Sequence, residues 1–296
     1  MTAASKIRTP SLDIAAELSG PETGAAVVLL HGFPYDVRSF DGVVGILAAA
    51  GCRTIVPYLR GYGPTHFLSA DTPRSGEQAA IGVDLRDLLD ALHVEQAILA
   101  GYDWGARAAN VVAALWPARV RGLVSCCGYQ IQDLAKAQLP VDPLQEYRFW
   151  YQHYFQTERG RQGLAANRSQ LCRLLWKLWS PSWQFDDATY QSSARSFDNP
   201  DFVDVAIHSY RHRMGYAAGD PRYADIELQL AKLPSIDVPT IVLHGADDGV
   251  NPVELSAGHN KRFTARYERR VLAGVGHNPP QEAPAEFARA VLDLMA

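Results

Sequence analysis

In the first and last parts of the sequence, segments with the apolar pattern of strands alternate with segments that have the pattern of helices. Six segments have the character of strands: 25–30, 54–57, 97–100, 120–127, 238–243 and 267–272. The runs 25–30 and 97–100 are uninterrupted and apolar, as in strands that are buried on both faces of a sheet, and 120–127 is of the same buried type. Segments between and after them have the length and spacing of helices with one buried face: 39–50, 77–92, 106–115 and 284–295. A weaker pattern at 12–17 predicts an early edge strand. Alternating strands and helices predict an α/β fold, with a mostly parallel sheet covered by helices on both faces.

This alternation stops after residue 130 and resumes near residue 234. The stretch between is rich in Trp, Tyr, Arg and Gln, and it contains helical patterns such as 171–179 but no convincing strand. The change in composition predicts two parts. Residues 1–130 and 234–296 are expected to form the core domain, and residues 131–233 a helical cap subdomain inserted into it.

Composition narrows the class of protein. The 296 residues are 47% hydrophobic and 20% charged, as in a globular chain with an ample core. A net charge of -4 without a basic block argues against nucleic-acid and membrane partners. No signal-peptide pattern or membrane-length apolar run occurs, and the four cysteines lack metal-ligand spacing, so we expect a cytoplasmic protein with reduced thiols. Without a dinucleotide fingerprint or a metal-ligand cluster, no cofactor and no metal are expected.

The apolar run that ends at residue 100 leads directly into Gly101-Tyr102-Asp103-Trp104-Gly105 and a helical segment. A strand, a tight turn and a helix in this order present the apex residue at the C-terminal end of the strand. The apex is Asp103, whose carboxylate is ionised at neutral pH and can attack carbon to form an ester. A Cβ at Gly101 or Gly105 is expected to collide with the neighbouring strand or helix. Asp103 could instead only cap the helix, but the complete pattern favours a nucleophile.

Two later strand ends carry acids and a histidine. The run 238–243 leads into a loop with Asp247 and Asp248, and the run 267–272 leads into Gly-Val-Gly-His277. Because parallel strands end at the same edge of a sheet, these groups can converge on Asp103. His277 can take a proton from water while an acid fixes its tautomer. From the residues alone, either Asp247 or Asp248 can be that acid.

The first buried run ends in His31-Gly32-Phe33-Pro34. This turn can leave the Phe33 N–H unpaired and directed into the site, as one donor of an oxyanion hole. The peptide bond before Pro34 can adopt the cis form. An ordinary loop between a strand and a helix is the alternative interpretation.

Taken together and in this order, the four motifs resemble those of the α/β-hydrolase superfamily over essentially the whole chain. The resemblance selects Asp248 as the acid, and it implies that the backbone N–H groups of Phe33 and Trp104 form the oxyanion hole. An Asp nucleophile is typical of epoxide hydrolases and hydrolytic dehalogenases. Trp104 does not separate these two, although fluoroacetate dehalogenases carry Arg at this position. Phe33 lacks the side-chain donor with which haloalkane dehalogenases hold the halide.

Two segments of the expected cap resemble those that carry the epoxide-polarising tyrosines of epoxide hydrolases. They are residues 150–156, which contain Tyr151, and residues 207–211, which contain Tyr210. A phenol in an apolar cap can hydrogen-bond the alkoxide that forms as an oxirane opens, and can then protonate it. Both tyrosines could instead be packing residues of an aromatic-rich cap.

We therefore predict an epoxide hydrolase that forms an ester on Asp103, which water activated by His277 and Asp248 then hydrolyses. The expected substrate is an apolar or aryl-bearing small epoxide, and the expected contacts are Phe33, Pro34, Trp104, Trp150, Tyr151, Phe155 and Tyr210. One alternative is a haloalkane-type dehalogenase with the same triad, and a less favoured one is a non-catalytic ligand-binding homologue. A serine esterase is disfavoured because no Ser occupies the turn. The oligomeric state, monomer or homodimer, stays open.

Overall fold

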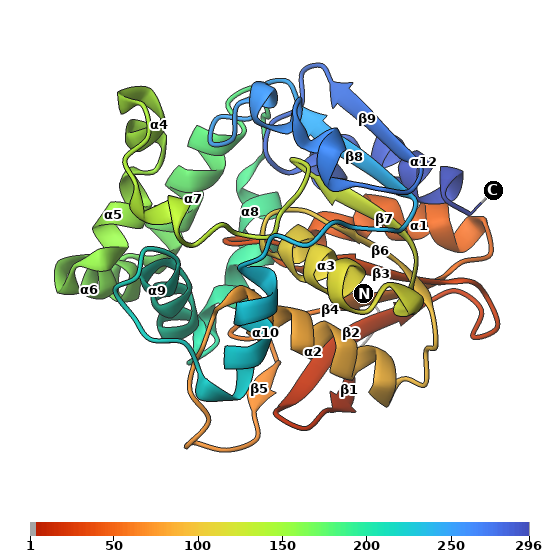
Figure 1. The fold of residues 1–296 in the computed structure, drawn as a ribbon, viewed down its shortest axis with the longest axis horizontal. Coiled ribbons are helices and arrows are strands. Elements are labelled where there is room, and N and C mark those ends of the chain that lie inside the picture. Colours follow the sequence, from red (N-terminus) through yellow and green to blue (C-terminus); the bar gives the residue numbers. More distant parts are fainter. Residues whose placement is uncertain (1–3, 296) are drawn as a thin grey trace.

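A nine-stranded sheet forms the centre of the computed structural model, which describes residues 4–295 (Figure 1). The strands are β1 (Ser5–Arg8), β2 (Leu12–Ser19), β3 (Ala26–Leu30), β4 (Arg53–Pro57), β5 (His66–Phe67), β6 (Ala97–Gly101), β7 (Val120–Cys126), β8 (Thr240–Gly245) and β9 (Tyr267–Leu272). They follow the order β1-β2-β4-β3-β6-β7-β8-β9, and β5 pairs with β2. β2 is antiparallel to its neighbours, whereas β4, β3, β6, β7, β8 and β9 run parallel. The predicted α/β fold class is confirmed.

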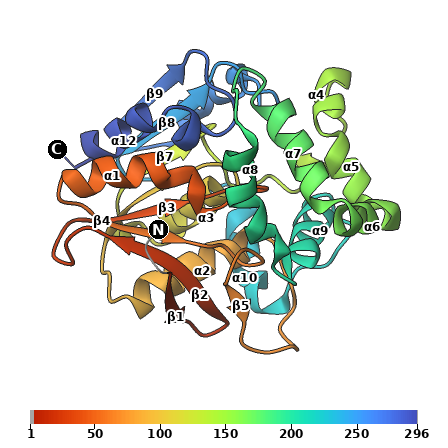
Figure 2. The same cartoon turned by 180° about the vertical axis from the view of Figure 1, so that it is seen from behind.

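Helices cover both faces of this sheet. Those of the first and last parts of the chain are α1 (Asp41–Ala49), α2 (Gln78–Ala91), α3 (Trp104–Leu115), α11 (Pro279–Glu282) and α12 (Pro284–Asp293). α2 and α3 pack together on one face (Figure 1), and α1 and α12 pack together on the other (Figure 2). Every residue of β6 is buried as a result, which explains why this strand reads as a continuous apolar run.

Residues 131–233, which we call the helical insertion, contain helices but no strand. These are α4 (Pro143–Arg148), α5 (Trp150–Gln156), α6 (Glu158–Ala166), α7 (Arg168–Trp179), α8 (Asp187–Ala194), α9 (Phe202–Arg213) and α10 (Ala224–Leu230). Helices α4–α9 are gathered at one side of the sheet in Figures 1 and 2. α10 returns to the core and packs against α2. Within residues 4–295, no helix combines the length and the apolar character that crossing a bilayer requires.

Several elements differ from the sequence pattern for identifiable reasons. The strand expected at 238–243 begins only at Thr240, because Pro239 has no N–H to donate to the sheet, and it continues to Gly245. β2 is not an edge strand, since β1 pairs along its outer side. The helix expected from residue 39 begins at Asp41, after a short 3₁₀ turn. The two residues of β5 are too few to produce a pattern.

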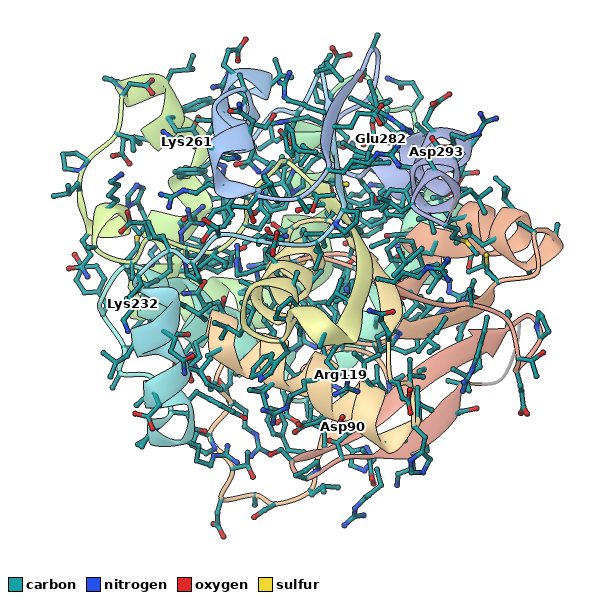
Figure 3. All side chains as sticks on the ribbon, turned by 45° about the vertical axis from the view of Figure 1, so that its right-hand side comes forward. Asp90, Arg119, Lys232, Lys261, Glu282 and Asp293 are labelled. Atoms are coloured by element: carbon teal, nitrogen blue, oxygen red, sulfur yellow. The ribbon has the colours of Figure 1, made fainter. Side chains whose placement is uncertain are left out.

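Charged pairs lie on the outside of the core (Figure 3). Arg119, just before β7, forms an ion pair with Asp90 of α2 at 2.6 Å, and the two side chains lie side by side in Figure 3. Arg270 of β9 pairs with Asp293 of α12 at 2.9 Å. Exposed pairs of this kind contribute about 0–1 kcal/mol each, so apolar burial rather than surface charge stabilises the fold.

The glycines on either side of Asp103 are required by close approach of the backbone. A Cβ on Gly105 would lie 2.0 Å from the Leu30 carbonyl oxygen, and one on Gly101 would lie 2.6 Å from the carbonyl carbon of Gly105. Both obstacles are backbone atoms, which cannot rotate away as a side chain can. The collisions expected from the sequence are therefore confirmed.

We predict that Gly105→Ala lowers the free energy of unfolding by about 2–3 kcal/mol, because overpacking forces the turn and β3 apart. Gly45→Ala is the matched control, since a Cβ at this site in α1 meets nothing within 4 Å. Alanine there should raise the free energy of unfolding by about 0.5–1 kcal/mol. Urea unfolding followed by circular dichroism measures both changes, and equal stabilities of the two variants would contradict the argument.

Candidate active site

Asp103 lies at the apex of the turn between β6 and α3. Its backbone has φ 50° and ψ −122°, a conformation that residues other than glycine rarely adopt. The Phe33 N–H donates a hydrogen bond of 2.8 Å to the Oδ1 atom of Asp103. Phe33 lies in the loop after β3, and its peptide bond to Pro34 is cis. The Trp104 N–H is the first of α3 and therefore has no acceptor within the helix. One backbone donor thus contacts the carboxylate, and a second, unpaired within its helix, follows Asp103 directly in the chain.

His277 lies between two carboxylates. Its Nδ1 atom is 2.8 Å from Asp248 Oδ2, and its Nε2 atom is 3.6 Å from Asp103 Oδ2. No other residue in the described chain hydrogen-bonds this Nε2 atom. Asp248 and His277 are both buried, whereas Asp247 is exposed. The geometry therefore separates the two acids that the residue pattern left open, and it pairs His277 with Asp248.

The three groups shift one another's pKa values. Burial raises the pKa of Asp103, but the hydrogen bond and charge of His277, followed by the charge of Arg107, bring it below the ordinary value. Burial also raises the pKa of Asp248, but His277 and two backbone N–H groups at 2.8 and 2.9 Å lower it overall. Burial lowers the pKa of His277, and Asp248 and Asp103 together raise it well above the ordinary value. Both carboxylates are therefore ionised at neutral pH.

A further carboxylate, that of Glu282, holds the loop that carries His277. It accepts hydrogen bonds from the backbone N–H groups of Gly276 at 2.6 Å and Asn278 at 2.9 Å. It also accepts one from the Ser180 hydroxyl at 2.6 Å, whose oxygen accepts the His277 N–H at 3.0 Å. Ser180 belongs to the helical insertion, so the core and the insertion position His277 jointly. Neither Ser180 nor Glu282 lies in a recognisable motif, so neither could be singled out from the sequence.

Cys127 also contacts this group, with its Sγ atom 3.4 Å from Asp248 Oδ2. Ligand atoms of Cys127, Asp248 and His277 lie within 4.8 Å of one another, a spacing that could hold a metal ion. A metal there would need the Asp248 and His277 atoms that now hydrogen-bond each other, so it would compete with that pair. No pattern in the chain marks this proximity, because Cys127 and Asp248 are 121 positions apart.

Tyr151 of α5 and Tyr210 of α9 line a cavity together with Asp103. Their rings are 5.3 Å apart at 88°, and the side chains are buried. The Tyr151 oxygen accepts a hydrogen bond from Gln152 Nε2 at 3.0 Å, which leaves the phenolic proton free to be donated. Burial is the largest cause that raises the pKa of each tyrosine. Both phenols therefore keep their protons at neutral pH.

The cavity has a volume of about 320 Å³ and lies where the core meets the helical insertion. Its lining combines the groups already described with apolar and charged side chains: Asp103, Arg107, Tyr129, Gln130, Ile131, Gln132, Asp133, Lys136, Ala137, Val141, Phe149, Tyr151, Gln152, Tyr210, Arg213, Val250 and Asn251. Arg107 is buried here, although the sequence analysis did not single it out.

Five other residues that the sequence analysis expected to contact substrate are outside this lining: Phe33, Pro34, Trp104, Trp150 and Phe155. The four aromatic ones pack against the two tyrosines instead, with ring centroids 5.4 to 6.3 Å apart. The Pro34 carbonyl accepts a hydrogen bond from Trp176 Nε1 at 2.7 Å. These side chains therefore support the wall of the cavity, and their predicted contact with substrate stays a prediction.

Comparison with known proteins places this arrangement in a family. The protein-family model described as the alpha/beta hydrolase fold matches residues 25–284 of this chain. This range includes the turn at Phe33 and the residues Asp103, Asp248 and His277. The chain belongs to the α/β-hydrolase family. The superfamily expected from the motifs is thereby confirmed. Ser125 of this α/β-hydrolase lies within β7 and not at the turn before α3.

Several relatives of this α/β-hydrolase are named as epoxide hydrolases. A crystal structure of a candidate epoxide hydrolase from Klebsiella pneumoniae has a TM-score of 0.96 and 48% identity, and the match covers 98% of this chain and 96% of that one. Epoxide hydrolase A of Mycobacterium tuberculosis is 26% identical over 305 positions, covering 93% and 91% of the two chains. Epoxide hydrolase 3 of Siraitia grosvenorii is 41% identical over 103 residues, and the match spans about a third of that relative's length, 32%.

Proposed function

We propose that this protein is an epoxide hydrolase that converts an epoxide to a vicinal diol through an ester on Asp103. The observation that carries the proposal is the placement of two protonated phenols, Tyr151 and Tyr210, in one cavity with the ionised Asp103 carboxylate. An epoxide oxygen leaves as a strongly basic alkoxide, which needs a proton donor at this position. The relatives named as epoxide hydrolases give independent support.

In the first step, a carboxylate oxygen of Asp103 attacks an oxirane carbon and the bond from that carbon to the ring oxygen breaks. Tyr151 and Tyr210 hydrogen-bond the oxygen as negative charge develops on it, and one of them transfers its proton. The product of this step is a hydroxyalkyl ester of Asp103. The left-handed backbone at Asp103 fixes the direction from which the carboxylate approaches.

In the second step, water attacks the carbonyl carbon of the ester. Esterification removes the charge of Asp103, whose hydrogen bond is among the interactions that raise the pKa of His277, so the neutral imidazole becomes accessible. Its Nε2 atom faces Asp103 and takes the proton from water, while Asp248 stabilises the imidazolium. The N–H groups of Phe33 and Trp104 hold the oxyanion of the tetrahedral intermediate. The intermediate collapses by breaking the bond between this carbon and the diol oxygen, which takes the proton of the added hydroxyl, so the diol leaves and Asp103 regains its charge. The proton that His277 gave up to become neutral restores the tyrosine.

The cap role of residues 131–233 and the class of substrate are part of the same proposal. Apolar side chains on the cavity wall, such as Ile131, Phe149 and Val250, suit an apolar or aryl-bearing carbon skeleton. All four cysteines are buried free thiols, which supports a reducing, cytoplasmic location.

One observation favours a hydrolytic dehalogenase as a second candidate. The indole Nε1 of Trp104, next to Asp103, is buried and has no hydrogen-bond partner in the described part of the chain. A buried donor next to the nucleophile could hold a departing halide, since unpaired buried donors are costly, although Trp104 lies outside the cavity lining described above. The two phenols argue against this alternative, because a halide leaves without a proton.

The proposal is tested by incubating the protein with a panel of alkyl and aryl epoxides. Haloalkanes and haloacids of matching carbon skeleton are tested in parallel. We expect diol from the epoxides and no halide from the halogenated compounds, measured by chromatography and by a halide assay. Halide release without diol formation would identify a dehalogenase instead. Ligand binding without turnover of any compound would identify a non-catalytic homologue.

A further inference from the structure

One arginine in the cavity is buried without a partner. Arg107 lies on α3, one helical turn after Asp103, and only 6% of its surface is exposed. Its Nε atom has no hydrogen-bond partner, and its guanidinium forms no ion pair with any other part of residues 4–295. Burial lowers the pKa of Arg107, Asp103 opposes this effect, and the positive charge of Arg213 adds to it. A charge held out of water in this way is costly unless something pairs with it.

The two acids whose charges act on Arg107 are already engaged. Asp103 is hydrogen-bonded by one backbone donor and faces the imidazole, as described above. Glu227 of α10 accepts hydrogen bonds from Gln78 Nε2 at 3.0 Å and from the Ala79 N–H at 2.9 Å. Neither carboxylate reaches Arg107 closely enough for an ion pair. The guanidinium is therefore available to a group that enters the cavity.

The opposite wall repeats this arrangement. Arg213 of α9 comes three residues after Tyr210, so both side chains lie on the same face of the helix. It also lines the cavity, packs over the Phe149 ring at 5.7 Å and has no ion pair within the described chain. Each wall thus carries a proposed catalytic group and, one turn further along, an arginine. The other two charges of the lining, Lys136 and Asp133, pair with each other at 3.7 Å and do not offset these cations.

We propose that Arg107 and Arg213 bind a carboxylate of the substrate, so that the epoxide taken by this site is an epoxy acid. This inference rests on the proposed epoxide hydrolysis and names its substrate class. A guanidinium matches a carboxylate with two parallel hydrogen bonds, which would satisfy the donors that are now unpaired. Each arginine lies one helical turn beyond the group proposed to act on the oxirane, and a helical turn rises about 5.4 Å. In the substrate, the carboxylate is therefore expected about three to five bonds from the oxirane ring. The apolar wall contacts the chain between them.

A competing explanation gives Arg107 a role toward Asp103 alone. Its charge lowers the pKa of Asp103, so its loss could weaken the nucleophile whatever the substrate. That role would affect charged and neutral epoxides alike. The two explanations therefore separate when two substrates that differ only in charge are compared.

The probes are oxiranylbutanoate, in which three methylenes separate the oxirane from the carboxylate, and its neutral amide. The measured quantity is the ratio of kcat/KM for the acid to kcat/KM for the amide. Arg107→Met should lower this ratio about 10- to 100-fold, the range expected for a lost hydrogen-bonded charge pair, and Arg107→Lys should restore part of it. Arg121→Met, which removes the same charge from an exposed site on β7, should leave the ratio as it is in the parent. Equal losses for both substrates in Arg107→Met would overturn the proposal.

Calorimetric binding of dihydroxyhexanoate, the diol of the same acid, separates this proposal from the proposed catalysis. Binding to the parent protein that weakens at least tenfold in Arg107→Met supports the carboxylate site, even if no epoxide is turned over. Equal binding by the two proteins counts against it. If Arg107→Met fails to fold, the same binding measurement is made on Arg213→Met, whose arginine is less buried. This variant is expected to bind dihydroxyhexanoate several-fold more weakly than the parent. No loss in that folded variant would contradict the role of the opposite wall.

Discussion

His277→Gln is expected to leave the protein as a stable ester of Asp103 after one encounter with an epoxide. Alkylation needs only the ionised carboxylate and the two phenols, so it should proceed. Hydrolysis of the ester needs a base at the position of Nε2, and its loss should slow this step about 10²- to 10⁴-fold. Intact-protein mass spectrometry should show an added mass equal to that of the epoxide, persisting for many times the parent's turnover time.

Asp103→Ala is the control for this experiment and should show no adduct, because the atom that forms the bond is gone. A single turnover of the parent in heavy-oxygen water adds a second measurement. Water attacks the carbonyl carbon of the ester, so the label should enter the Asp103 carboxylate and not the diol. Label in the diol after one turnover, or normal turnover by His277→Gln, would show that the assigned nucleophile or base is wrong.

Replacing both phenols, as Tyr151→Phe with Tyr210→Phe, should nearly abolish alkylation by epoxides while the fold survives. Each single change removes one of two donors to the developing alkoxide and is expected to cost about 2.7–4 kcal/mol, less where the remaining donor compensates. The hydrolysis of a preformed ester should hardly change, because its oxyanion meets the backbone donors at Phe33 and Trp104. Stopped-flow measurement of ester formation separates the two steps.

Tyr154→Phe is the matched control for the tyrosine variants. Tyr154 lies on α5 close to Tyr151, but it does not line the cavity, so its hydroxyl should be dispensable for alkylation. Circular dichroism verifies the fold of each variant. A folded double variant that alkylates at the parent rate would remove the main reason for preferring an epoxide over a halogenated substrate.

The residues whose position follows directly from local structure could be predicted from the chain alone. Asp103 follows the buried strand β6 and His277 follows β9, a half-buried strand at the edge of the sheet, each at a glycine-rich turn. Their position at the C-terminal ends of parallel strands and their mutual approach could therefore be predicted. The same logic placed Phe33, whose N–H reaches Asp103. The strand boundary at Thr240 was missed by two residues because hydropathy does not register the missing N–H of a proline.

Groups brought together only by tertiary structure were not predictable in this way. Glu282, Cys127 and Arg107 reach the site from a helix end, a strand end and a helix interior, with no pattern in their neighbours that marks them. Arg107 is a case in point. An arginine is usually exposed, but nearly all of α3 is buried, and Arg107 faces a cavity whose lining includes residues of the helical insertion.

The hydrogen bond from the His277 backbone to Ser180 has a consequence for protein engineering and for the evolution of this architecture. Exchange of the helical insertion for that of a relative would change one wall of the cavity and with it the substrates that fit. Here the exchange would also replace a residue that orients the base, through the shared carboxylate of Glu282. A chimera is expected to retain hydrolysis only if the donor segment brings a hydroxyl to position 180. Selection on substrate range and selection on turnover therefore act on the same stretch of chain.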